Sequence, residues 1–119
     1  MLNKIYYCYP GGKFKVLTIS YDDGKQEDRR LLEIFNENGV KGTFHINYGL
    51  MDQEVRINKE EIADLYVGHE IAAHTYTHPT IARCPSTLVA QEVLNDRIGL
   101  ETLVSYPVRG LSYPNGSFD

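Results

Sequence analysis

The sequence predicts an α/β fold built around a parallel sheet, and two observations support this. Short apolar runs typical of buried strands alternate with longer segments in which apolar residues recur at helical spacing. Glycine, proline and asparagine separate these segments. Repeated strand-helix-strand units require parallel pairing with right-handed crossovers. We therefore expect about four parallel strands with intervening helices, in a single domain over residues 1–119.

Each predicted strand is a short apolar run followed by polar residues or a turn. The expected strands are Val16–Tyr21, Gly42–Asn47, Glu70–His74 and Val108–Tyr113. Because the strands are parallel, their carboxyl ends should lie at one edge of the sheet, where catalytic side chains gather in β/α folds.

The predicted helices lie between these strands. The first covers Asp28–Asn38, and its expected apolar face consists of Leu31, Ile34 and Phe35. The second begins at Asn58, where Glu61 completes a capping box, and it ends at Gly68. The third opens at Pro85. Its expected apolar face consists of Ala90, Val93, Leu94 and Ile98.

Composition and charge exclude several classes of protein. Hydrophobic residues make up 42% of the chain and charged residues 24%, as in ordinary globular domains. The net charge of -4 and the scattered basic residues argue against nucleic acid or an anionic membrane as a partner. Cys8 and Cys84 are far apart, as expected for reduced thiols, and the first residues do not read as a signal peptide. We therefore expect a cytoplasmic protein.

Two acidic residues follow the first predicted strand, and two histidines follow the third. Asp22 and Asp23 are adjacent, whereas His74 and His78 are four positions apart and could meet on a single helical turn. Two imidazoles and one carboxylate form a metal site that leaves positions open for water. A metal lowers the pKa of bound water to about 7, and a second carboxylate can take its proton.

Several phrases in this order resemble the polysaccharide deacetylases that share the NodB homology domain, carbohydrate esterase family 4. The family's first motif is T-F-D-D-G, and residues 20–24 read SYDDG. Its second motif is H-[ST]-x-x-H, and residues 74–78 read HTYTH. Residues 39–44 (GVKGTF) and 68–74 (GHEIAAH) are similar to the family's second and third strands. The ordered set is specific, although each motif alone is weak.

This resemblance implies a fold, an activity and a role for each motif residue. The fold is a partial (β/α) barrel. Asp22 is the implied general base, and Asp23, His74 and His78 are the implied ligands of a divalent metal, preferably zinc. The implied activity is metal-dependent removal of acetyl groups from N-acetylated or O-acetylated carbohydrate.

The family's third motif is matched only in part. R-P-P-Y-G corresponds here to SYPNG at residues 112–116. Ser112 stands in the register of the arginine that orients the catalytic aspartate, and Arg109 could replace that arginine only if the strand bulges. The backbone N–H of the motif can still stabilise an oxyanion. The implied substrate-binding residues are Tyr113, Pro114 and Asn115.

Other conspicuous residues have structural interpretations. Asp-Gly is ordinary turn chemistry, which gives residues 22–24 a structural alternative. We expect His45 to be a hydrogen-bonded structural histidine and His69 to pack under the third strand. The tyrosines of residues 6–9 are expected to cover the end of the barrel, and Cys84 is not an expected ligand.

The chain is short for the fold that it resembles. A closed (β/α) barrel needs about 200 residues or more, so 119 residues predict an incomplete domain. The family's late acid histidine has no counterpart here, which predicts a weak or inactive fragment. The alternative function is a non-catalytic module that binds metal or carbohydrate. An open sheet edge predicts a homo-oligomer. The apolar side chains expected to lie uncovered are those of Val16, Leu17, Ile19, Phe44 and Ile46.

Overall fold

The computed structural model describes residues 6–118, and within them three parallel strands form the sheet. The strands are β1 (Ser20–Asp22), β2 (Thr43–Ile46) and β3 (Glu70–Ala73), in the order β1-β2-β3. Asp22 lies opposite His45 in the register of β1 and β2, and Ile46 lies opposite Ala73 in that of β2 and β3. The α/β class and the parallel pairing are thus confirmed.

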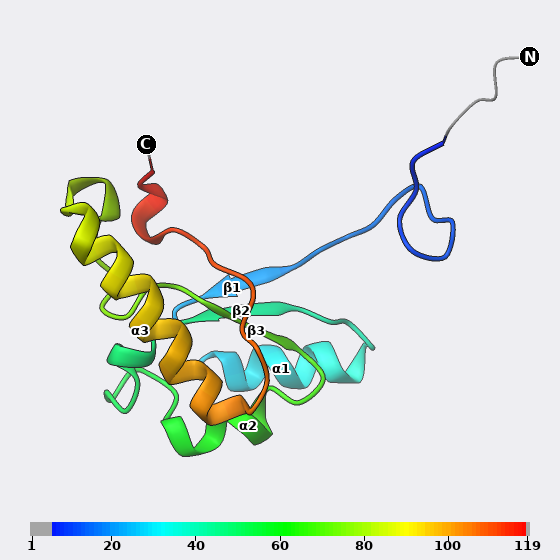
Figure 1. Cartoon of the computed structure of the whole chain (residues 1–119). Coiled ribbons are helices and arrows are strands. Elements are labelled where there is room, and N and C mark those ends of the chain that lie inside the picture. The colour runs from blue at the N-terminus through cyan, green and yellow to red at the C-terminus, as the bar shows by residue number, and fades with distance from the viewer. Residues whose placement is uncertain (1–5, 119) are drawn as a thin grey trace, which may run out of the picture.

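Helices connect the strands and cover the sheet (Figure 1). They are α1 (Asp28–Glu37), α2 (Ile62–Leu65) and α3 (Ser86–Val104). α3 packs beside β3 and also contacts α2. Single turns of 3-10 helix occupy Tyr48–Leu50, Lys59–Glu61, Ile81–Arg83 and Pro114–Gly116. The predicted second helix is therefore a short α-helix preceded by a 3-10 turn.

The hydrophobic core lies between the sheet and the helices. The Phe44 ring of β2 packs on Phe35 of α1 at 6.1 Å and on Tyr66 at 5.0 Å between ring centroids. Phe44 and Ile46 are fully buried, so our expectation that they would lie uncovered was wrong. Burial of each such side chain contributes about 1.5–3 kcal/mol to stability. α1 and α2 already cover this face of the sheet.

The buried faces of two helices differ from the predicted ones. α1 buries Leu32 and Phe35 but leaves Ile34 41% exposed. α3 leaves Leu94 and Ile98 more than half exposed. It buries Glu92, Asp96, Gly99 and Leu100 instead. Apolar spacing thus gave the wrong face of α3, because polar side chains of this helix bond to the loop after β3.

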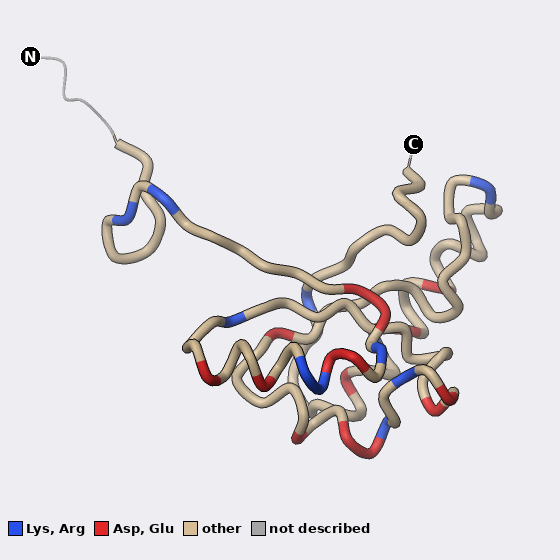
Figure 2. Tube along the Cα trace, turned by 180° about the vertical axis from the view of Figure 1, so that it is seen from behind, with Lys and Arg blue, Asp and Glu red and all other residues tan. Residues whose placement is uncertain are grey.

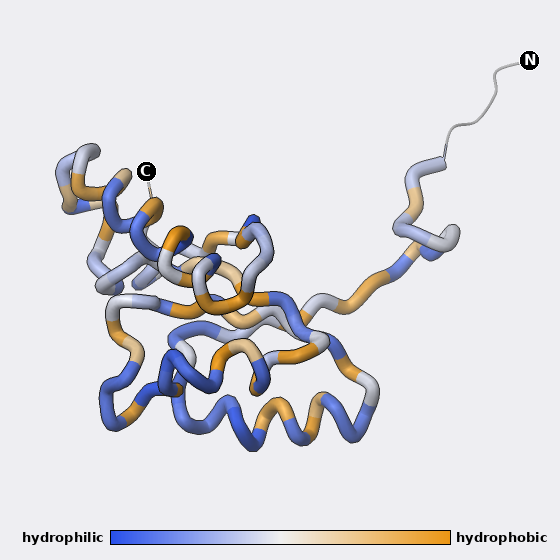
Figure 3. The backbone as a smooth tube through the Cα atoms, turned by 60° about the horizontal axis from the view of Figure 1, so that its bottom comes forward, coloured by the Kyte–Doolittle hydropathy of each residue, from blue (hydrophilic) through white to orange (hydrophobic). Residues whose placement is uncertain are grey.

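The chain before β1 extends away from the body of the protein (Figure 1). The predicted strand from Val16 forms only at Ser20–Asp22, and Val16 and Leu17 are exposed, as predicted for these two. Tyr7 is 93% exposed, so the aromatic segment of residues 6–9 does not cover the end of the sheet, contrary to our expectation. Hydrophobic residues are visible along this extension in Figure 3.

The fourth predicted strand, Val108–Tyr113, is present only as a single bridge between Ala73 and Leu111. The Ala73 N–H donates to the Gly110 carbonyl oxygen at 2.9 Å, and the Ser112 N–H donates to the Ala73 carbonyl oxygen at 3.1 Å. This short pairing still carries the chain along the outer side of β3. It brings Ser112 to the carboxyl edge of the sheet.

Charged residues of both signs are interspersed over the body of the protein (Figure 2). Acidic side chains outnumber basic ones by 16 to 12 in the sequence. Lys and Arg residues are scattered along the trace in Figure 2. Within residues 6–118, no helix has both the length and the apolar character needed to cross a membrane.

Candidate active site

A cluster of carboxylates and imidazoles lies at the carboxyl edge of the sheet. β1 ends at Asp22 and is followed by Asp23, and the loop after β3 brings His74 and His78 to the same place. Asp23 Oδ1 lies 4.0 Å from His74 Nε2 and 3.5 Å from His78 Nε2. One ligand atom from each of these three residues falls within 4.8 Å of the others. The structure thus brings together the three predicted metal ligands.

The two histidines do not lie on a helical turn, contrary to our expectation. Residues 74–78 form an irregular loop in which Thr75 (φ 68°) and His78 (φ 59°) adopt the left-handed region. Asp23 does the same with φ 86°. Such positions cost about 1–3 kcal/mol each and persist when the surrounding structure fixes them. A regular helical turn would not accommodate these left-handed residues, so the loop itself sets the directions of both rings.

His74 is oriented by a backbone contact on its far nitrogen. Its Nδ1 lies 3.0 Å from the Ser112 carbonyl oxygen and 2.6 Å from Ser112 Oγ. A carbonyl oxygen only accepts hydrogen bonds, and Ser112 Oγ already donates to Asp22, so Nδ1 carries the proton. Nε2 therefore keeps its lone pair and faces Asp23. Burial lowers the pKa of His74, and the nearby Asp22 charge opposes this shift. A neutral imidazole held by a carbonyl on its second nitrogen is the usual state of a metal ligand.

Asp23 presents an oxygen with no partner to the two imidazoles. Its Oδ1 is buried and accepts no hydrogen bond from the residues described here, although Arg56 Nη1 lies 3.3 Å away. Burial raises the pKa of Asp23, but the charge and hydrogen bonding of Arg56, together with His78 and Lys25, outweigh burial, so the net shift of the pKa is downward. Two nitrogens and one orphaned carboxylate oxygen form a donor set that fits a divalent transition metal.

Arg56 is a site residue that sequence reasoning missed. Its guanidinium also donates to the Asp23 carbonyl oxygen, and its backbone bridges to Lys25. The Ile57 N–H donates to the Gly24 carbonyl oxygen at 2.9 Å and holds the two loops together. Arg56 lies in a loop 33 residues away from Asp23 with no motif around it, so no local signal could have identified it.

Asp22 stands beside the cluster with its side chain half exposed. Its Oδ1 lies 2.9 Å from His45 Nδ1 and accepts a hydrogen bond of 3.3 Å from Ser112 Oγ. Ser112, in the register of the family's arginine, therefore contacts the carboxylate itself. We had expected His45 to be a hydrogen-bonded structural histidine near the carboxyl end of its strand. The pairing of Asp22 with His45 across β1 and β2 is the signal that would have placed it at the site.

The other predicted site residues lie around this cluster. Tyr113 stacks on Phe118 and faces the start of α3, and Pro114 is buried. Asn115 donates through Nδ2 to Thr80 Oγ1 at 3.1 Å, and its φ of 60° leaves it in the left-handed region. Their role in binding substrate stays a prediction.

Arg109 lies at the other end of β3. It lines a hollow together with Glu70 and Ile71, at the amino end of this strand. Asp22 lies at the carboxyl edge of the sheet. Arg109 therefore does not replace the family's third-motif arginine, and the predicted possibility of a bulged strand is not realised.

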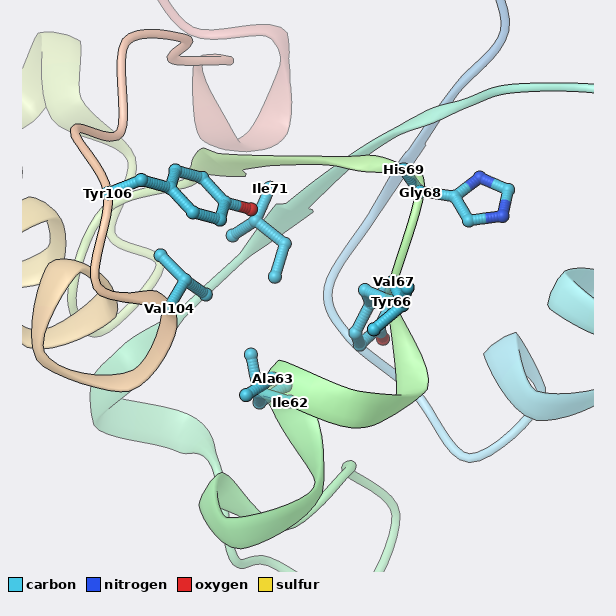
Figure 4. A pocket seen from close by; sticks show the side chains of 9 residues that line it. All are labelled: Ile62, Ala63, Tyr66, Val67, Gly68, His69, Ile71, Val104 and Tyr106. Carbon is cyan, nitrogen blue, oxygen red and sulfur yellow. The ribbon is translucent and has the colours of Figure 1, made fainter.

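A hollow lies far from the carboxylates, at the amino end of β3 (Figure 4). It has a volume of about 260 Å³ and is lined mainly by apolar side chains of α2, β3 and the end of α3. His69 lies at its rim with the ring turned towards α1. His69 Nδ1 accepts from the Gly42 N–H at 3.2 Å, as suits the structural role expected for it. We assign no chemistry to this hollow.

Comparison with known proteins agrees with this geometry. The sequence model of the polysaccharide deacetylase family matches residues 6–119. The chain therefore belongs to the polysaccharide deacetylase family. Among solved structures, the fold is similar to the Streptococcus pyogenes deacetylase PplD in complex with acetate, with a TM-score of 0.84 and 18% identity over 92% of this chain. It is also similar to BA3943, a pseudoenzyme from Bacillus anthracis, with a TM-score of 0.72 and 24% identity over 86% of this chain.

Two curated relatives are similar in sequence. A chitin deacetylase of Arthroderma benhamiae is 32% identical over 81 residues, which are 65% of this chain and 21% of the relative. A chitooligosaccharide deacetylase of Bradyrhizobium is 30% identical over 78 residues, 64% of this chain and 34% of the relative. The chain spans half of the PplD structure, 36% of the BA3943 structure and smaller shares of these curated relatives.

Proposed function

We propose that this chain carries the metal-binding and base-bearing part of a hydrolase that removes acetyl groups from acetylated carbohydrate. The observation that supports it best is the orphaned Asp23 Oδ1 facing two imidazole nitrogens, with a second carboxylate, Asp22, beside it. Family membership gives the class of reaction. The acetylated glycan as substrate comes from the relatives named above.

Asp23, His74 and His78 would hold the metal. Two imidazoles and one carboxylate suit zinc, which we propose as the ion. A bound zinc ion would polarise the acyl carbonyl and make water acidic enough to attack near neutral pH. Two parts of the fold support these residues: Asp23 follows β1 and contacts Arg56, and both histidines lie in the loop after β3.

Asp22 is the general base of the proposed reaction. It lies beside the proposed metal ligands and is not one of them. Its side chain is about half exposed, so the carboxylate can reach an incoming water. Ser112 Oγ donates a hydrogen bond to one of its oxygens, Oδ1, and His45 Nδ1 lies 2.9 Å from the same oxygen. The other oxygen, Oδ2, is 3.9 Å from His74 Nε2 and can accept the proton. A carboxylate with one oxygen fixed and one free is well placed for proton transfer.

Protonation of the leaving group has no candidate among the histidines of this chain. His69 is turned towards α1, His45 contacts Asp22, and the other two are the proposed ligands. An amide needs a protonated leaving amine, whereas an ester depends on this step much less. This favours a second candidate function, a module that binds metal or carbohydrate without turnover.

Zinc binding by two matched variants tests the proposal. His78→Ala should lose zinc, because it removes a ligand, whereas Asp22→Asn should keep zinc and lose hydrolysis of an aryl acetate. Asp64→Asn, an exposed carboxylate on α2, is the control that keeps both. Isothermal titration and elemental analysis measure the metal. A wild-type chain without zinc affinity, or equal zinc loss in His78→Ala and Asp22→Asn, contradicts the assignment. Zinc binding without any ester hydrolysis favours the non-catalytic module.

A further inference from the structure

α3 turns two buried carboxylates towards the loop that carries the histidines. Asp96 Oδ2 accepts a 2.8 Å hydrogen bond from the His74 N–H, and its Oδ1 accepts one of 2.6 Å from the Tyr48 N–H. Glu92, one helical turn earlier, accepts from the Thr77 N–H at 2.7 Å and from Thr77 Oγ1 at 2.6 Å. Both oxygens of each carboxylate are therefore engaged by backbone or side-chain donors.

Burying these two carboxylates would be unfavourable in free energy for α3 if they had no hydrogen-bond partners. Glu92 and Asp96 are buried, with 7% and 0% of their surfaces exposed, while Leu94 and Ile98 point towards solvent. Burying a carboxylate is unfavourable unless its oxygens are hydrogen bonded. Packing alone would have turned the apolar side chains inward. The bonds to the loop therefore account for the face that α3 buries.

The loop needs support from outside because two of its residues are in the left-handed region. Thr75 and His78 are not glycines, so their positive φ values carry a conformational cost. Asp96 holds the first residue of the loop, His74, and Glu92 holds Thr77, the neighbour of His78. Asn47 Nδ2 also donates to the carbonyl oxygens of His74 and Thr75.

We infer that Glu92 and Asp96 are positioning residues, which hold the loop of residues 74–78 so that both imidazoles face Asp23 before a metal arrives. The inference rests on the proposed function, since it assigns the loop to metal binding. Neither carboxylate touches the metal position. Each acts through the backbone next to a ligand, and its removal would lower metal affinity by letting the loop relax.

Thr77 offers the least disruptive test, because its side chain is exposed and its hydroxyl bonds to Glu92. Thr77→Val removes this hydroxyl and keeps the shape, and Thr77→Ser restores the hydroxyl. We expect Thr77→Val to weaken zinc binding roughly threefold to tenfold, the effect of losing one hydrogen bond of ordinary strength at an exposed side chain. Thr77→Ser should stay within about twofold of the wild-type chain, because it retains that bond.

Glu92 itself gives a second, larger comparison. Glu92→Met should weaken zinc binding about tenfold or more, as does loss of an outer hydrogen-bond partner in other metal sites. Glu92→Gln can still accept from the Thr77 N–H and donate to its hydroxyl, so it should bind nearly as tightly as the wild-type chain. Gln91→Met, an exposed neighbour on the same helix, is the control for the methionine.

Amide exchange of residues 74–78 in the metal-free chain separates this inference from the proposed function. Thr77→Val and Glu92→Met should exchange faster in this loop, whereas Thr77→Ser and Glu92→Gln should not. Unchanged exchange together with unchanged zinc affinity in Thr77→Val would overturn the inference, even if Glu92→Met fails to fold. Equal weakening by valine and serine would also overturn it. A wild-type chain that binds no zinc refutes the proposed function alone, and the exchange rates still decide the inference.

Discussion

Replacing Gly99 by alanine should destabilise the protein, although the same change stabilises most helices. Alanine in a helix interior is favoured over glycine by about 1 kcal/mol. At Gly99, however, an added Cβ would lie 2.4 Å, 2.6 Å and 2.7 Å from ring carbons of Tyr48. Ordinary carbon contacts are about 3.5–4.0 Å, so the ring would have to move by about 1 Å. Overpacking of this kind costs about 1–3 kcal/mol net.

The effect of this change should reach the site as well as the core. Tyr48 donates its N–H to Asp96, whose other oxygen holds the His74 N–H, so displacing Tyr48 disturbs the histidine loop. Thermal unfolding of Gly99→Ala should show a Tm lower by roughly 4–12 °C, at about 4 °C per kcal/mol for this size. Asn95→Ala, at an exposed position of α3, should leave Tm unchanged or slightly raised. A Tm equal to or above that of the wild-type chain in Gly99→Ala would refute the reasoning.

The remaining predictions concern pH, substrate and association. Burial, and then the Lys41 charge, lower the pKa of His69, so the folded protein disfavours a proton that the unfolded chain accepts. The stabilising contribution of neutral His69 should therefore be full above about pH 6.5 and be lost as the pH decreases. Urea unfolding as a function of pH should show a smaller loss of stability at low pH in His69→Gln than in the wild-type chain. The metal-loaded chain should hydrolyse aryl acetates faster than N-acetylated sugars, because lack of a positioned acid lowers the rate of amide hydrolysis by about 10²–10⁴-fold. Comparable rates for the amide and the ester in a side-by-side assay would contradict this. The open edge of β1 and the exposed Val16 and Leu17 predict a dimer or larger assembly. Light scattering at micromolar concentration tests this prediction, and a clean monomer would disprove it.

The order of elements could be predicted because it depends on local patterns. Apolar runs and helical spacing gave the α/β class and the parallel sheet, and the carboxyl edge of the sheet then followed from topology. The first strand was predicted to begin at Val16, but β1 begins only at Ser20. Within residues 6–118 β2 is its only neighbour, and the two strands pair only from Ser20. Periodicity cannot report how many neighbours a strand has.

The cluster of Asp23, His74 and His78 was predictable from motif spacing, but its geometry was not. Residues 74–78 match a helical spacing, yet the structure has a loop with left-handed residues, which the residue types do not indicate. The contact of His45 with Asp22 depends on strand register, which determines which residues of adjacent strands lie opposite each other. Arg56 comes from a loop with no sequence pattern.

Two errors of the sequence-based prediction fall at the site, and the physics of the site explains both. Pattern rules assume that helices bury apolar faces and that residues other than glycine avoid positive φ. α3 breaks the first rule at Glu92 and Asp96, and the histidine loop breaks the second at Thr75 and His78. The two violations compensate each other, because the buried carboxylates accept the hydrogen bonds that hold the loop. Local rules fail where a loop must present two imidazoles to one carboxylate, and such conflicts are expected at functional sites.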